Sequence, residues 1–198
     1  MFKNSIINTV GALVLFTVSI TANAAFVDFD VYAKANSTSG SGTGLNTGLS
    51  YSIGDTITGS VDVNDLWNAG RLPRWSNADG LVANLFATGS DDSGEALGTQ
   101  IGQDFGTWTQ HGETFAYGSL VGEINNVFFL LGTNFNVTAM QAGVLSLYYW
   151  DENSSDNTGL VTVSIDNGVS AVPVPAAIWL FGSGLIGFFG ARKTKRSV

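Results

Sequence analysis

The 198-residue sequence contains no cysteine, a single histidine and few cations. Without cysteine, the chain cannot form disulfides, cysteine-based zinc sites or a thiol nucleophile. The lone His111 excludes a histidine-cluster metal site, and no G-x-S-x-G segment marks a serine nucleophile to go with it. We therefore expect His111 to lie in a loop or at the surface, and we expect the protein not to be an enzyme.

Cations are scarcest in the middle of the chain. All sixteen Asp and Glu lie between residues 25 and 171, where only Lys34, Arg71 and Arg74 are basic, which gives this region a formal charge of −13. Such a surface repels phosphate backbones, so nucleic acid is not an expected partner. The carboxylates either serve solubility alone or, in part, gather cations.

The first 24 residues have the pattern of a secretory signal peptide. One cation, Lys3, precedes an apolar run from Val10 to Ile20, and Ala22-Asn23-Ala24 supplies an A-x-A exit. The run is too short to span a hydrocarbon layer of about 30 Å. We expect a signal helix over 1–24 that signal peptidase removes after Ala24; the alternative is a buried N-terminal helix.

The last 27 residues are the most apolar of the chain and end in cations. Residues 176–191 are uncharged, and as a helix rising about 1.5 Å per residue they would cover roughly 24 Å, close to a membrane span. Pro173 and Pro175 prevent a helix from running on out of the preceding domain. Arg192 and Lys193 open a basic end that would stay cytoplasmic. We predict a transmembrane helix at 176–191.

The order Val-Pro-x-Pro-Ala-Ala, Trp-Leu-Phe-Gly-Ser-Gly-Leu and a basic end resembles the PEP-CTERM sorting signal, over residues 172–198 with Pro173, Pro175, Arg192 and Lys193 as its marks. Val174 stands where that family usually has Glu. The resemblance implies a Gram-negative bacterium, export, transient residence in the inner membrane, and processing by an exosortase-type enzyme. The product would reach the cell surface, the outer membrane or the extracellular exopolysaccharide matrix.

Residues 25–171 amount to one domain that alternates short apolar runs with glycine-rich turns. No stretch of it has a long three-to-four-residue apolar period, so we predict an all-β fold, an antiparallel β-sandwich of jelly-roll-like form. Asn125-Asn126 is a plausible tight hairpin turn. Strands are expected over 27–33, 49–63 with a break at Gly54-Asp55, 81–89, 115–124, 127–133, 135–140, 144–150 and 160–165.

A loop with five acidic or amide side chains, YYWDENSSDNTG at 148–159, separates the last two predicted strands. Calcium prefers six to eight oxygen ligands from carboxylates, amides and backbone carbonyls, and this loop offers all three. It is not an EF-hand, because Asp156 and Thr162 replace the required Gly and Glu. On spacing alone, a plain acidic turn and a calcium site are equally good interpretations.

The pieces YSIGDTITGSVDVNDLW, NADGL, YGSLVGEI and a strand that runs into Asp, an acidic–Asn pair, Gly and VTVSI are similar to the bacterial PA-I galactophilic lectins, over most of residues 50–165. That family implies a galactose-binding-like β-sandwich with one calcium ion, onto which a sugar places two hydroxyls.

The resemblance implies that Asp151 is the first metal ligand and that Asp156 and Asn157 are a ligand pair. Backbone carbonyls near Ser154 or Ser155, and near Ala69 or Gly70, would complete the set. Asp151 and Asn157 would also face the sugar. The positions of the family's sugar-contacting side chains correspond to Ser76 and Asp79 here, so the resemblance does not fix the sugar.

Trp67 or Trp75 could stack on a sugar face, although we favour core packing for each. We expect a calcium-dependent carbohydrate-binding domain that associates with surface or extracellular polysaccharide. A structural matrix protein without specific sugar binding is the alternative. Glycoside cleavage by paired carboxylates is a third interpretation, but no segment indicates two opposed carboxylates in a cleft.

Overall fold

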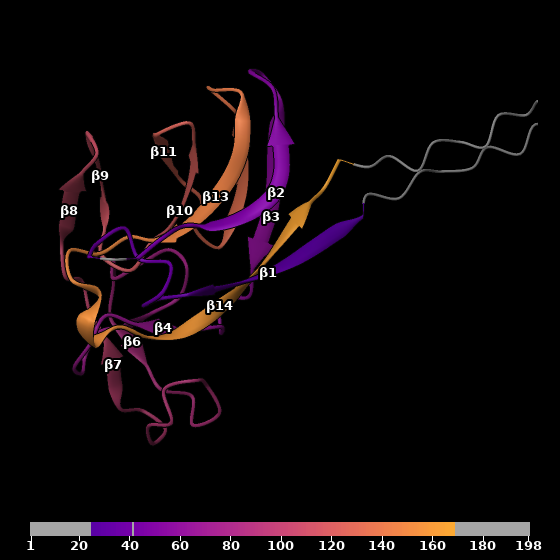
Figure 1. Cartoon of the computed structure of the whole chain (residues 1–198). Helices are drawn as coiled ribbons and strands as arrows, with labels where there is room; N and C mark the ends of the chain where they lie inside the picture. Colours follow the sequence, from indigo (N-terminus) through magenta and orange to yellow (C-terminus); the bar gives the residue numbers. More distant parts are fainter. Residues whose placement is uncertain (1–24, 41, 169–198) are drawn as a thin grey trace, which may run out of the picture. The chain divides into compact units, whose positions relative to one another are not determined.

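The computed structural model describes residues 25–40 and 42–168, which fold into short strands joined by turns (Figure 1). The longer strands are β1 (Phe26–Tyr32), β2 (Leu45–Tyr51), β3 (Thr56–Val61), β10 (Leu120–Ile124), β12 (Asn134–Thr138), β13 (Gly143–Tyr149) and β14 (Thr158–Asp166). The shorter ones are β4 (Trp67–Asn68), β5 (Trp75–Ser76), β6 (Leu85–Phe86), β7 (Gln100–Gly102), β8 (Thr107–Gln110), β9 (Glu113–Ala116) and β11 (Val127–Leu130). A single 3-10 turn, η1 (Ser154–Asp156), precedes β14.

Two antiparallel sheets carry most of these strands. One has the order β12-β3-β14-β4-β5, with β1 also paired to β14, and the other has the order β11-β10-β13-β2. Two further pairs, β6-β7 and β8-β9, complete the set. Every strand ladder is antiparallel. The all-β, antiparallel prediction is therefore confirmed.

Strict alternation in β13 and β14 builds the main core. Val161, Val163 and Ile165 of β14 have no exposed surface, and neither have Leu145 and Leu147 of β13. Because side chains point to opposite faces at every second residue, each strand gives one apolar row to a shared interior. Burial of one such side chain contributes about 1.5–3 kcal/mol.

The predicted Asn125-Asn126 hairpin is confirmed. It joins β10 to β11, with Ile124 paired to Val127, and both asparagines have positive φ, 52° and 65°. A tight hairpin whose two central residues both have φ above zero matches the right-handed twist of its strands, and asparagine tolerates that conformation better than most residues.

Three other expectations have different outcomes. The break at Gly54-Asp55 is confirmed, since β2 and β3 flank it and belong to different sheets. The strand expected over 81–89 shrinks to Leu85–Phe86, because Leu81 is bonded through its backbone to the loops at Phe105 and Tyr117 instead of to a neighbouring strand. The β8-β9 hairpin was not expected; His111 lies exposed at its turn, as predicted, and stacks on Phe128 at 4.6 Å.

The expected signal helix (1–24) and sorting tail (172–198), with its membrane helix at 176–191, lie outside the described residues. Within 25–40 and 42–168, no helix is long and apolar enough to cross a membrane. At one end of the β1–β14 pair, Phe26 is opposite Asp166 and the Asn167 N–H donates to the Ala25 carbonyl at 3.0 Å. The opposite end of β14 follows directly on η1 (Figure 1).

We predict that Leu147→Ala lowers the free energy of unfolding by about 2–5 kcal/mol, because it leaves a cavity between the two sheets. The matched control is Leu97→Ala, whose side chain is 79% exposed and which should change stability by no more than about 0.5 kcal/mol. Urea unfolding followed by tryptophan fluorescence measures both. Equal losses for the two variants would contradict this account of the core.

Candidate functional site

Several hydrogen bonds hold the loop between β13 and β14 in place. Its 3-10 turn is capped at both ends: the Asn153 side chain accepts from the Ser155 N–H at 3.1 Å, and the Asn157 N–H donates to the Ser154 carbonyl at 3.4 Å. Lys34 Nζ donates to the Ser155 carbonyl at 2.9 Å. Asn and Ser favour such local turns because their side chains bond nearby backbone groups.

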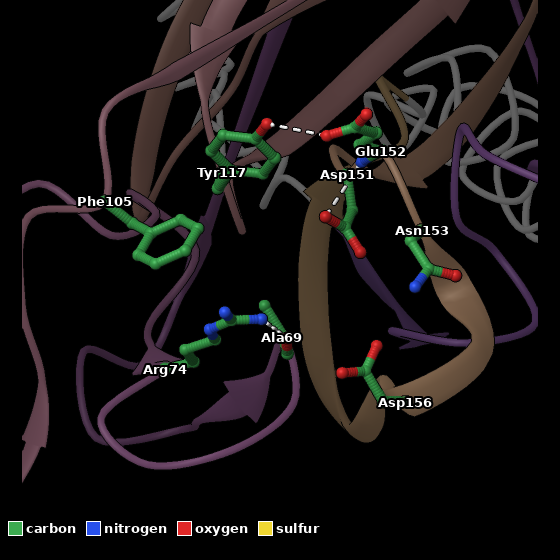
Figure 2. A pocket seen from close by; sticks show the side chains of 8 residues that line it. All are labelled: Ala69, Arg74, Phe105, Tyr117, Asp151, Glu152, Asn153 and Asp156. Carbon is green, nitrogen blue, oxygen red and sulfur yellow. Dashed lines mark hydrogen bonds between the residues drawn. The ribbon is translucent and has the colours of Figure 1, made fainter.

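A cavity of about 460 Å³ opens beside this loop. In Figure 2, Asp151, Glu152, Asn153 and Asp156 form one wall, and Phe105, Tyr117, Arg74 and Ala69 form the facing one. The first wall is acidic and comes from a single loop. The second contains two aromatic rings and one cation and brings together segments around residues 69–74, 105 and 117. The volume of the cavity lies within the range of roughly 300–1,000 Å³ that is typical of small-molecule pockets.

Asp151 is a buried carboxylate, only 5% exposed, at the end of β13. Its Oδ1 accepts from the Glu152 N–H at 2.8 Å. Burial raises the pKa of Asp151 above its usual range, and the Asp156 charge raises it further, while the Asn157 amide and two backbone N–H groups partly offset these effects. The site thus holds an ionised Asp151 at an energetic cost unless a cation joins it.

Asn157 lies beside Asp151 and is 1% exposed. Its Nδ2 donates to the Ala33 carbonyl at 3.2 Å, whereas its buried Oδ1 has no hydrogen-bond partner. A buried acceptor without a donor costs about 1–3 kcal/mol. Asn157 does not itself line the cavity, but it is hydrogen-bonded to Asp151, which does.

Asp156 is exposed and extends from η1 to the loop at Ala69 and Gly70. A Cβ at Gly70 would lie 2.3 Å from Asp156 Oδ2, and Gly70 has a φ of +118°, so only glycine fits there. The Ala69 carbonyl receives a long bond, 3.5 Å, from Arg74 Nη1. The structure thus brings the 69–70 backbone to the acidic loop.

The facing wall is a chain of ring contacts. Tyr117 packs edge-on against Phe105, with centroids 5.5 Å apart, and the Arg74 guanidinium lies 4.4 Å over the Phe105 ring. The Tyr117 hydroxyl donates to Glu152 Oε2 at 3.1 Å, which links the two walls.

Three residues that we expected at the sugar do not line this cavity. Trp67 has no exposed surface and its Nε1 donates to the Gly118 carbonyl at 2.9 Å, while Ser76 is 2% exposed. Asp79 is exposed but accepts from the Thr133 N–H at 2.7 Å, in another turn. Trp75 packs against a small separate cluster of Leu66, Ala87 and Ile101.

Ser154, whose backbone carbonyl the resemblance implied as a metal ligand, supplies structure to the loop. Its carbonyl caps the turn, and its hydroxyl lies over Gly40. Arg74, Phe105 and Tyr117 were missed from the sequence, where aromatic residues are frequent and give no positional signal. Arg74 did carry one signal: it is one of three cations among sixteen carboxylates.

Among the described residues, no group of three or more His, Cys, Asp or Glu is placed to hold a metal ion. A cation at this loop would therefore draw on amide and backbone oxygens as well as on Asp151 and Asp156. That donor set, made only of oxygens, fits calcium better than zinc.

The chain ends in a recognisable signal. Residues 171–196 match the PEP-CTERM protein-sorting motif. The motif indicates a secreted protein that an exosortase processes and that is sorted to the cell envelope, so this prediction from the sequence is confirmed.

No curated protein shows significant similarity to the chain. Among solved structures, an EclA N-terminal domain, a PllA-like lectin, resembles it at 20% identity and a TM-score of 0.44; the likeness covers 70% of this chain and 93% of that one. Such a distant likeness does not bear on the ligand, which must be inferred from the residues of the pocket.

In a chelator, we predict that wild-type protein loses stability relative to Asp151→Asn as pH rises from about 4 to 7. Because burial raises the folded-state pKa of Asp151, the stability given by the protonated form is complete below the unfolded-state pKa and is lost as pH passes the folded-state pKa. Thermal melts of both proteins across this range measure it. Glu113→Gln, an exposed change on β9, is the control, and a pH-independent gap would contradict the prediction.

Proposed function

We propose that this exported protein is a non-enzymatic, calcium-dependent carbohydrate-binding domain with a jelly-roll-like, galactose-binding-like β-sandwich. It would act at the cell surface, outer membrane or exopolysaccharide matrix. The sorting motif supports the location. The binding activity and the calcium requirement rest on the pocket beside the 150–157 loop.

One observation carries the proposal: the unpartnered Oδ1 of buried Asn157 lies in a side chain that also contacts the buried Asp151 carboxylate. The buried Asp151 carboxylate receives hydrogen bonds from the fold but stays negatively charged when ionised, and the buried Asn157 Oδ1 receives none. A buried charge and an open buried acceptor side by side favour a site completed from outside. Calcium satisfies both with one ion.

Asp151, Asp156 and the Asn157 Oδ1 would hold the ion, with the Ala69 carbonyl from the facing loop. The carbonyls of Ser154, Ser155 and Ala69 each accept one hydrogen bond, from Asn157, Lys34 and Arg74, and the bond to Ala69 is the longest of the three at 3.5 Å. Since calcium takes six to eight oxygens, positions remain for water or for two neighbouring sugar hydroxyls. Binding through two hydroxyls makes the ion selective, because only certain sugar ring stereochemistries present both hydroxyls at the angle that the ion requires.

Phe105 and Tyr117, and not Trp67, provide the aromatic surface for the apolar side of a sugar ring, because they line the cavity while Trp67 is buried.

A single shallow site of this kind binds weakly, so dense display on a surface would raise the apparent affinity. Because β14 rises about 3.3 Å per residue over its nine residues, the acidic loop lies at the opposite end of this strand from Asp166.

Binding is favoured over glycoside cleavage by the placement of the carboxylates. Asp151, Glu152 and Asp156 all come from one loop and one wall, whereas glycosidases place carboxylates on both sides of the scissile bond. Glu152 is further engaged by the Tyr117 hydroxyl.

We predict that millimolar calcium raises the Tm of the wild-type protein and that Asp151→Ala abolishes this rise. A ligand at one hundred times its Kd adds about 2.7 kcal/mol of stability, which corresponds to several degrees. Melting curves in calcium and in chelator measure it, with Glu113→Gln expected to behave as wild type. Coincident wild-type curves in the two conditions would refute the calcium assignment.

A glycan array at high display density separates binding from a purely structural role. We expect hits in calcium that disappear in chelator and with Asp151→Ala. Calcium stabilisation without any hits would favour the matrix protein, in which the ion only rigidifies the loop.

A further inference from the structure

We propose that this pocket selects an acidic sugar, a hexuronate, whose carboxylate is bound by Arg74 while its ring hydroxyls face the 150–157 loop. The inference rests on the proposed carbohydrate-binding function and adds the ligand class and the residue that determines it. Arg74 is not one of the proposed metal ligands, and its one contact with that set is the long hydrogen bond to the Ala69 carbonyl.

Arg74 is half-buried in the pocket wall and forms no salt bridge with any residue of 25–40 and 42–168. This is unexpected in a region with sixteen carboxylates and three cations, three of those carboxylates being in the same cavity. Arginine presents five N–H donors in a planar fork. Only Nη1 has a bond to the protein, the long one to the Ala69 carbonyl.

The guanidinium is held in place by an apolar surface rather than by a carboxylate. It lies over the Phe105 ring at 4.4 Å, and Phe105 in turn packs edge-on against Tyr117. A cation over the face of an aromatic ring is held by the electrostatic attraction of the ring, which leaves its N–H groups to other partners. A planar fork with a free edge in a cavity suits a planar carboxylate, which it can bind through two parallel hydrogen bonds.

The alternative role for Arg74 is to neutralise the acidic wall. Figure 2 shows it on the facing side, beside Phe105 and Ala69, while Tyr117 and not Arg74 bonds Glu152. With a calcium ion bound, Asp151 and Asp156 would be offset, and a cation on the other wall would remain for the ligand. The pocket would then have one end for a diol and another for an anion.

A hexuronate matches this division because its carboxylate, at C6, and its hydroxyls, at C2 to C4, lie on different edges of one ring. The neutral hexose of the same stereochemistry differs only at C6. Comparison of the two therefore isolates the contribution of Arg74.

The test measures binding of the full-length protein in detergent, with calcium, to matched methyl glycosides: galacturonate and galactose, glucuronate and glucose, mannuronate and mannose. We expect the acid of at least one pair to bind about tenfold more tightly than its neutral partner. Arg74→Gln should reduce that ratio to about one, and Arg74→Lys, which keeps the charge but loses the fork, should give an intermediate ratio. Arg71→Gln, an exposed cation outside the pocket, should leave it unchanged.

The outcomes separate this inference from the proposed function. If calcium binds and neutral sugars bind as well as acids in every pair, or if Arg71→Gln and Arg74→Gln act alike, the acidic-sugar inference is overturned and the lectin proposal stands. If neither calcium nor any sugar binds, the proposed function itself fails. Calcium affinity of Arg74→Gln serves as the folding control, because it should equal or exceed that of wild type when a nearby cation is removed.

Discussion

Burial of the Asp151 carboxylate and the Asn157 amide at the junction of β13 and β14 is the constraint on which the pocket depends. Both strands carry apolar rows into the core, so Asp151, just after β13, and Asn157, just before β14, are drawn inward with them. A charged group in that position is costly unless something pairs with it. The fold supplies Ala33 for the Asn157 Nδ2 and a backbone N–H for Asp151, and leaves the Asn157 Oδ1 open. Under the proposed function, a cation would satisfy both the Asp151 charge and the open Asn157 oxygen.

The surrounding contacts make this loop rigid rather than merely acidic. Asn153 and Asn157 cap the 3-10 turn, Lys34 binds it from the β1–β2 connection, and Thr38 Oγ1 bonds the Asp151 backbone on both its N–H and its carbonyl. A preorganised set of ligands loses less entropy on binding than a mobile one. Of the three cations between residues 25 and 171, Lys34 therefore binds the loop and Arg74 lies in the wall that faces it.

Export and ligand chemistry are consistent with each other. Calcium sites of extracellular modules have dissociation constants of roughly 0.1–1 mM, which a few carboxylate and carbonyl ligands provide. A domain with sixteen carboxylates and three cations repels anionic polymers in general. Specific recognition of an acidic sugar then requires a locally positive site. A bound calcium ion together with Arg74 would create such a site in the pocket, although the rest of the domain carries a net negative charge.

The sequence alone determined the sorting motif, the all-β class, most strand positions and the Asn125-Asn126 turn, because these depend on local order: alternation of period two, turn residues and a contiguous tail. It also pointed to Asp151, Asp156 and Asn157, which share one loop. Only the tertiary structure decided that Trp67 and Ser76 are buried, that Asp79 serves another turn, and that Arg74, Phe105 and Tyr117 face the loop. Those placements arise from the packing of segments far apart in the chain, and no local pattern records which side chains such packing leaves exposed.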